Sequence, residues 1–178
     1  MEWCSREKEK RNLWFIEGNH EFYISRNRSE YFTEVFQDHA FLDDGALFAA
    51  HGDRINHHDT AFALLRGCLR NPFSYFVVKL FGYTGFGTSF SGEVRKDLRT
   101  TNQKQKHYFP EAELQALDQV LKSKNVTSAV VGHFHRSGQS GIIQILENFT
   151  EGQYTVGVYE SGKGIRTFTV HELFGVLE

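Results

Sequence analysis

Three short loops of this 178-residue chain carry side chains whose types suit metal-ion chemistry. Each loop follows a short apolar run that predicts a β-strand. Imidazole and amide-oxygen ligands suit borderline divalent ions such as manganese, iron or zinc, whereas calcium prefers a cage of oxygen ligands. The pattern therefore indicates a site for a borderline ion. The loops are Gly18-Asn19-His20-Glu21, His51-Gly52-Asp53 and Gly132-His133-Phe134-His135.

The position of the loops after strands favours one shared site. In sheets covered by helices, ligands collect beyond the carboxyl ends of the strands, and glycine beside a ligand lets the backbone turn sharply. We therefore expect Asn19, His51 and His133 to converge at one edge of a sheet. Each motif has an ordinary alternative, such as a turn at Gly18-Asn19 or two strand residues sharing a face at His133 and His135. Their joint occurrence favours the metal site.

The elements that must position these loops alternate between strands and helices, which predicts an α/β fold. Apolar runs predict strands at 13–16, 41–44, 46–50 and 126–131, and the runs at 142–146, 154–159 and 165–170 predict an antiparallel meander. Charged residues 1–11 resemble the end of a helix. Two further helices are predicted, one from Ser29 with Tyr31, Phe32, Val35 and Phe36 on its apolar face, and one from Pro110 with Leu114, Leu117, Val120 and Leu121.

Residues 59–109 predict a helical lid inserted into a single domain of residues 1–178, because their apolar residues, many of them phenylalanine, fall at helical spacing. Basic residues, Arg66 among them, decorate this segment. An apolar lid with basic residues suits a lipid-linked phosphate at an anionic membrane surface, and we expect Arg66 to bind substrate. The plain alternative is a helical subdomain with a solvated basic face.

The composition excludes several classes of protein. A net charge of -2 and a pI near 6.5 argue against a nucleic-acid binder. Two cysteines are too few for a disulfide framework or a cysteine-rich zinc site. No apolar run approaches the roughly 18 residues that span a bilayer. We expect a cytoplasmic protein with peripheral contact to the inner face of a membrane.

The three loops resemble, in residues, order and spacing, the last three signature motifs of the calcineurin-like metallophosphoesterases. The resemblance implies a layered sandwich of mixed sheets flanked by helices, and a hydrolase that uses two divalent ions, manganese foremost. It implies that Asn19, His51 and His133 hold one ion and that His135 holds its neighbour. His20 would protonate the leaving oxygen or stabilise its charge. Glu21 and Asp53 would orient imidazole rings, or serve as turn and cap residues.

The layout is similar to that of the UDP-2,3-diacylglucosamine pyrophosphohydrolase branch, whose helical cap lies in this position and receives acyl chains. Asp59 corresponds to a substrate-side aspartate of that branch. His20 stands where the branch usually has arginine, and Ser137 replaces its proline. These departures favour a general phosphoesterase or a related lipid phosphoesterase.

Two earlier family motifs, Asp-x-His and Gly-Asp-x-x-Asp, are absent from the sequence. We therefore expect an N-terminally incomplete chain without its first two strands, in which one metal site keeps three ligands and the other keeps His135. The main rival interpretation is a catalytically incomplete phosphoesterase-fold scaffold that binds proteins. A phosphoprotein phosphatase is the second rival, although it would favour an open polar groove over a phenylalanine-rich lid.

Overall fold

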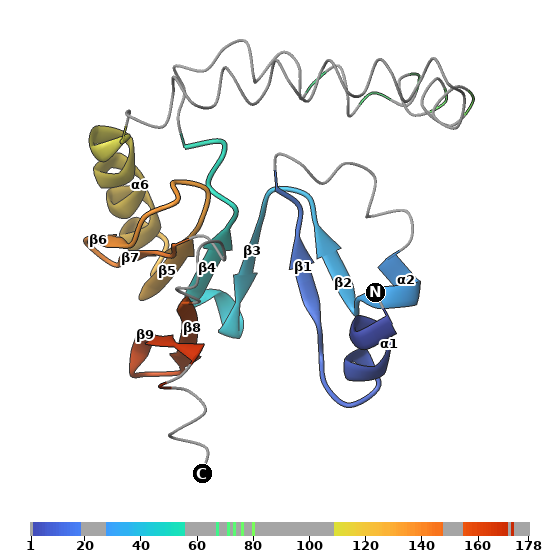
Figure 1. The fold of residues 1–178 in the computed structure, drawn as a ribbon. Coiled ribbons are helices and arrows are strands. Elements are labelled where there is room, and N and C mark those ends of the chain that lie inside the picture. Colours follow the sequence, from blue (N-terminus) through green and yellow to red (C-terminus); the bar gives the residue numbers. More distant parts are fainter. Residues whose placement is uncertain are drawn as a thin grey trace. The chain divides into compact units, whose positions relative to one another are not determined.

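The computed structural model describes residues 2–18, 28–55, 109–147, 155–170 and 172, and five single residues between 66 and 81. The chain separates into two compact units, Met1–Asn56 with Pro110–Glu178 and His57–Phe109. The predicted lid at 59–109 lies almost entirely outside the described residues. The first unit is a mixed α/β structure with several sheets (Figure 1).

The N-terminal elements form a two-stranded parallel sheet with two helices. Strand β1 pairs with β2, and the Glu17 N–H extends the ladder by donating to the Phe36 carbonyl at 2.8 Å. The Phe15 and Phe32 rings stack at 4.8 Å between centroids. The predicted strand at 13–16 is confirmed, although Trp14 is 46% exposed. The elements are α1 (Glu2–Lys8), β1 (Trp14–Ile16), α2 (Arg28–Tyr31) and β2 (Glu34–Phe36).

The helix predicted from Ser29 is wrong beyond Tyr31. Helix α2 ends there, and Val35 lies in β2, opposite Phe15 of β1. The apolar spacing of this segment fits a helix, but β-branched side chains prefer extended backbone. The ladder to β1 supplies hydrogen bonds that a longer helix would forgo. Val35 is 8% exposed in the strand, so the apolar residue is buried all the same.

A five-stranded mixed sheet holds the main core. Its order is β3-β4-β5-β7-β6, with β4, β5 and β7 parallel and each outer strand antiparallel to its neighbour. A 3-10 turn, η2 (Asp43–Gly45), joins the first two strands, as the sequence predicted for the turn at Asp44 and Gly45. The strand predicted at 41–44 is confirmed for Phe41 and Leu42 and wrong for Asp43 and Asp44, which belong to η2. The strand predicted before each histidine loop of this sheet is confirmed. The strands are β3 (His39–Leu42), β4 (Leu47–Ala50), β5 (Ser128–Val131), β6 (Gly138–Ser140) and β7 (Ile143–Ile145).

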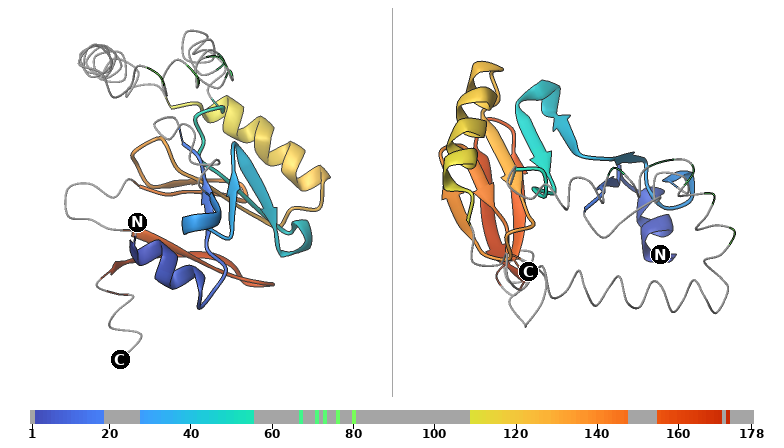
Figure 2. Two further views of the ribbon diagram at one scale, coloured as in Figure 1. Left: turned by 90° about the vertical axis from the view of Figure 1, so that its right-hand side faces the viewer. Right: turned by 90° about the horizontal axis from the view of Figure 1, so that it is seen from above.

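Helix α6 (Glu111–Ser123) lies beside β5, β6 and β7, as Figure 2 shows from two further sides. It begins after Pro110, as predicted. Leu114 and Leu121 are buried, but Val120 is 50% exposed, so its place in the predicted apolar stripe is wrong. Asp118 is buried instead, since residues four and seven after Leu114 share its face of the helix.

The Asp118 carboxylate links α6 to the turn between β6 and β7 by a hydrogen bond. It accepts a hydrogen bond from the Ile142 N–H at 2.7 Å. Gly141 in the same turn has φ +58°, and a Cβ there would overlap this carboxylate. The turn therefore needs a residue without a side chain.

The C-terminal strands β8 (Thr155–Glu160) and β9 (Gly164–Thr169) form an antiparallel hairpin. The Tyr159 hydroxyl donates to Asp43 Oδ2 at 2.6 Å, which ties the hairpin to η2. The predicted meander is confirmed for these two strands and wrong for β7, which pairs with β5 and β6. Strand β6 is short and polar, so apolar periodicity gave no sign of it. Within the described residues, no helix is long and apolar enough to cross a membrane.

Candidate functional site

Strands β4 and β5 bring His51 and His133 together. Ala50 at the end of β4 lies opposite Val131 at the end of β5, and each histidine loop begins at the next residue. The Gly132 N–H donates to the His51 carbonyl at 3.0 Å, so the ladder continues into the loops. The two imidazole rings lie 5.2 Å apart between centroids, with an interplanar angle of 68°. The predicted convergence of these two residues is confirmed.

The close approach of the two loops depends on Gly52. Its φ is +106°, and a Cβ there would lie 2.9 Å from the Gly132 carbonyl oxygen and 3.3 Å from the His133 Cβ. A side chain at this position would push the loops apart. The sequence predicted a sharp turn at this glycine, but not its close approach to the neighbouring loop.

Both histidines of the Gly132–His135 loop have left-handed backbone. His133 has φ 73° and His135 has φ 54°, whereas few residues other than glycine adopt positive φ. Such conformations cost of order 1–3 kcal/mol each and cluster at binding and catalytic sites. His51 and His133 are half-buried and His135 is exposed. The loop therefore holds one imidazole against His51 and leaves the other open to solvent.

The spacing of the two rings fits a shared ion. A ligating ring nitrogen lies about 2.0–2.1 Å from such an ion, and the ring centroid lies about 1.1 Å behind that nitrogen. Two rings that bind one ion at about the tetrahedral angle have centroids about 5.2 Å apart. The observed separation is 5.2 Å. Unligated rings in edge-to-face contact are separated by similar distances, so the spacing permits an ion without requiring one.

The structure describes only some of the remaining predicted site residues. His135 lies in the same loop as His133, two residues later. Among the residues that the structure describes, no group of three or more His, Cys, Asp or Glu side chains is arranged to hold a metal ion. The other predicted residues, Asn19, His20, Glu21, Asp59 and Arg66, lie outside the described residues.

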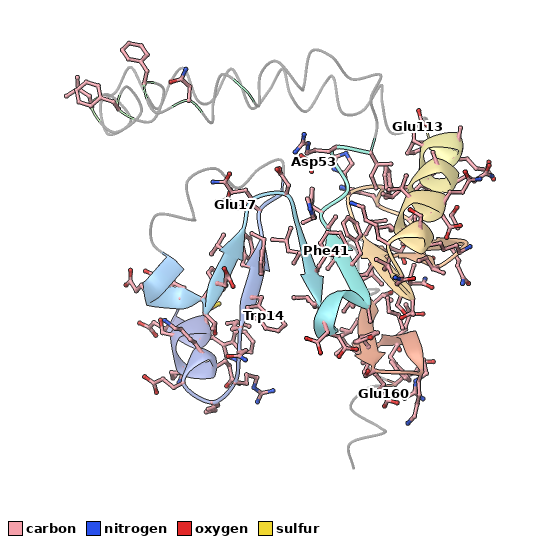
Figure 3. All side chains as sticks on the ribbon, turned by 180° about the vertical axis from the view of Figure 1, so that it is seen from behind. Trp14, Glu17, Phe41, Asp53, Glu113 and Glu160 are labelled. Atoms are coloured by element: carbon pink, nitrogen blue, oxygen red, sulfur yellow. The ribbon has the colours of Figure 1, made fainter. Side chains whose placement is uncertain are left out.

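Buried and paired charges lie close to the ends of the strands. Asp53 is 5% exposed, beyond the carboxyl end of β4, and Glu17 is 2% exposed, directly after β1 (Figure 3). Arg54 Nη1 lies 2.8 Å from Asp38 Oδ2. Sequence reasoning missed Glu17, Asp38 and Arg54. Glu17 could have been found from the sequence, since it is a charged residue between an apolar strand and a candidate ligand loop. The Asp38–Arg54 pair depends on strand register.

The chain matches no protein-family model and no curated protein with significant similarity. The resemblance to calcineurin-like metallophosphoesterases therefore depends on the three loops themselves. The geometry above bears on the second and third of them.

Proposed function

We propose that this chain is a metal-dependent phosphoesterase that hydrolyses a phosphate ester or pyrophosphate bond. The observation that carries the proposal is the meeting of the His51 and His133 rings at the carboxyl ends of adjacent parallel strands. In this proposal Asn19 joins these two histidines around one divalent ion, and His135 holds a second. The fold proposed with it is the layered metallophosphoesterase sandwich, with residues 59–109 as the lid.

Two divalent ions, manganese foremost and iron or zinc next, would polarise the phosphoryl group and activate water as the nucleophile. The protein's part would be to present ring nitrogens from His51 and His133, whose loops begin directly after the paired residues Ala50 and Val131. Asp53, buried two residues after His51, is suited to orient a ligating ring by accepting a hydrogen bond from its second nitrogen. His20 would donate a proton to the leaving oxygen.

A lipid-linked or nucleotide-sugar phosphate is the proposed substrate class. Phe73, Phe76 and Leu80 each have helical backbone and are 71%, 59% and 56% exposed. Their spacing of three and four residues is the spacing at which residues share one face of a helix. Exposed apolar residues of this kind suit acyl chains or peripheral contact with the inner face of a membrane. Asp59 and Arg66 are the proposed substrate-binding residues.

Manganese binding measured by titration calorimetry tests the proposal. We expect His51→Ala and His133→Ala each to weaken Mn²⁺ binding by at least about tenfold, in the range seen when residues that support a metal site are lost. The matched control is His39→Gln, because His39 is an exposed histidine whose ring neighbours are Phe41 and Phe48. Wild-type affinity in both alanine variants would refute the metal site.

Hydrolysis separates the enzyme from its rival. We expect Mn²⁺-dependent cleavage of bis(p-nitrophenyl) phosphate, or of a diacyl lipid diphosphate presented in mixed micelles, and loss of cleavage in His133→Ala. Mn²⁺ binding without hydrolysis of either substrate would favour the catalytically incomplete scaffold. Faster turnover of a phosphopeptide than of either ester would favour the phosphoprotein phosphatase.

A further inference from the structure

An ion pair between Asp38 and Arg54 lies at the same edge of the sheet as the histidine rings. Asp38 directly precedes β3, whose first residue, His39, lies opposite Ala50. The next position along this antiparallel ladder places Asp38 beside His51. Arg54 follows His51 by three residues, in a turn that the Ile55 N–H closes by donating to the Gly52 carbonyl at 3.1 Å.

The strand order places this pair and His133 on opposite flanks of His51. Strand β4 lies between β3 and β5, and neighbouring strands are separated by about 4.8 Å. Asp38 directly precedes one neighbouring strand, and His133 follows the end of the other. The Arg54 side chain is 66% exposed and that of Asp38 is 27% exposed. Because Arg54 contacts Asp38, its solvent-exposed guanidinium lies within a few strand spacings of the His51 and His133 rings.

We propose that Arg54 binds a phosphate group of the substrate, and that Asp38 orients the guanidinium before the substrate arrives. A guanidinium presents five N–H donors in a planar fork that matches phosphate oxygens two at a time, and Asp38 accepts one contact, from Nη1. The other N–H groups of the Arg54 guanidinium are suited to bind an anion at this edge of the sheet. The inference rests on the proposed function, because it assigns Arg54 to the substrate of that site.

A second ion pair in the chain provides a control. Arg166 Nη2 lies 3.0 Å from Glu160 Oε1, and these side chains are 58% and 38% exposed. A Cβ at Gly164, the first residue of β9, would lie 3.5 Å from Ser128 Oγ, at the start of β5. This pair is thus similar in chemistry and exposure but lies toward the opposite end of β5 from His133.

The test compares three variants, Arg54→Ala, Arg54→Lys and Arg166→Ala, with the wild type in the presence of Mn²⁺. The kinetics of bis(p-nitrophenyl) phosphate cleavage give kcat and KM, and titration calorimetry gives the Kd for orthophosphate. We expect Arg54→Ala to raise KM and the orthophosphate Kd by about tenfold, the loss expected for one charged hydrogen-bonding partner. The kcat should change less than KM. Arg54→Lys should recover part of the loss because it keeps the charge without the fork. Arg166→Ala should match the wild type.

The outcomes separate this inference from the proposed function. Unchanged KM and orthophosphate affinity in a folded Arg54→Ala protein would overturn the role of Arg54 and leave the phosphoesterase proposal standing. If the wild type cleaves no ester, the proposed function fails and orthophosphate binding alone decides. In that case weaker binding by Arg54→Ala than by Arg166→Ala supports the anion site, whereas equal binding, or no binding by the wild type, overturns it.

Discussion

Replacing Asp118 by alanine should destabilise the protein through the contact between α6 and the β6–β7 turn. Asp118 is 8% exposed, and its Oδ1 accepts a hydrogen bond from the Ile142 N–H at 2.7 Å. Its Oδ2 accepts a hydrogen bond from Lys122 Nζ, also at 2.7 Å. The Lys122 ammonium first, and the Ile142 N–H second, hold the pKa of Asp118 below its ordinary value.

The size of the effect follows from these two contacts. A backbone N–H donating to a carboxylate contributes about 1.5–3 kcal/mol, and its loss leaves that N–H without the acceptor. The Lys122 side chain is 52% exposed, so its ion pair adds less than about 1 kcal/mol. We expect Asp118→Ala to lower the free energy of unfolding by about 2–3 kcal/mol, and Tm by roughly 4–12 °C for a chain of this size. Lys122→Ala should cost less than about 1 kcal/mol.

The pH dependence has a definite sign. Because folding lowers the pKa of this carboxyl, its contribution is fully present above the unfolded pKa of about 3.9 and is lost as the pH falls toward the folded pKa. The difference in stability between wild type and Asp118→Ala should therefore persist near neutral pH and narrow below about pH 4.

Urea denaturation followed by circular dichroism, near neutral pH and again below about pH 4, measures both quantities. The control Asp118→Asn keeps an acceptor for Ile142 while removing the charge, so it should lose less stability than the alanine variant. A difference between Asp118→Ala and wild type within about 0.5 kcal/mol at neutral pH, or one that acidification leaves unchanged, would refute this reasoning.

Two further predictions concern backbone and side-chain contacts outside α6. Gly52→Ala should weaken Mn²⁺ binding and lower stability by more than about 1–2 kcal/mol, since it adds a clash with the Gly132 carbonyl to the strain of φ +106°. The control Gly45→Ala has φ +92° but open space around it, so calorimetry and urea titration should show strain alone and unchanged Mn²⁺ affinity. The Tyr159 hydroxyl lowers the pKa of Asp43, so Tyr159→Phe should raise that pKa in a carbon-13 NMR titration. An unmoved Asp43 titration would show that the hydroxyl has no such effect.

The fold could be predicted from the sequence where the local pattern of apolar residues and turns matches the strands that form. Short apolar runs predicted the strands before His51 and Gly132, and the Asp44-Gly45 turn predicted the connection between β3 and β4. Periodicity failed at Val35, where a strand pairing overrode helical spacing, and at β6, which has no apolar residue to reveal it.

The candidate site was predictable to the extent that it depends on topology. Two histidines that follow adjacent parallel strands must lie near each other, and they do. The pairing of Asp38 with Arg54 was not predicted, because it depends on the register of β3 against β4. Turn type and loop length set that register, and the strand predicted from Phe41 did not extend to His39, next to Asp38. For Asn19 and His20 the expectation of convergence stays a prediction.

The contact between Asp118 and Gly141 has an evolutionary consequence. The helix side chain occupies the space where a side chain of the turn residue would lie, so Gly141 cannot gain a side chain while an Asp or Asn acceptor stays at position 118. Relatives of this chain that keep such an acceptor should therefore keep the glycine as well. Such covariation offers a criterion for recognising distant homologues that does not depend on the histidine loops.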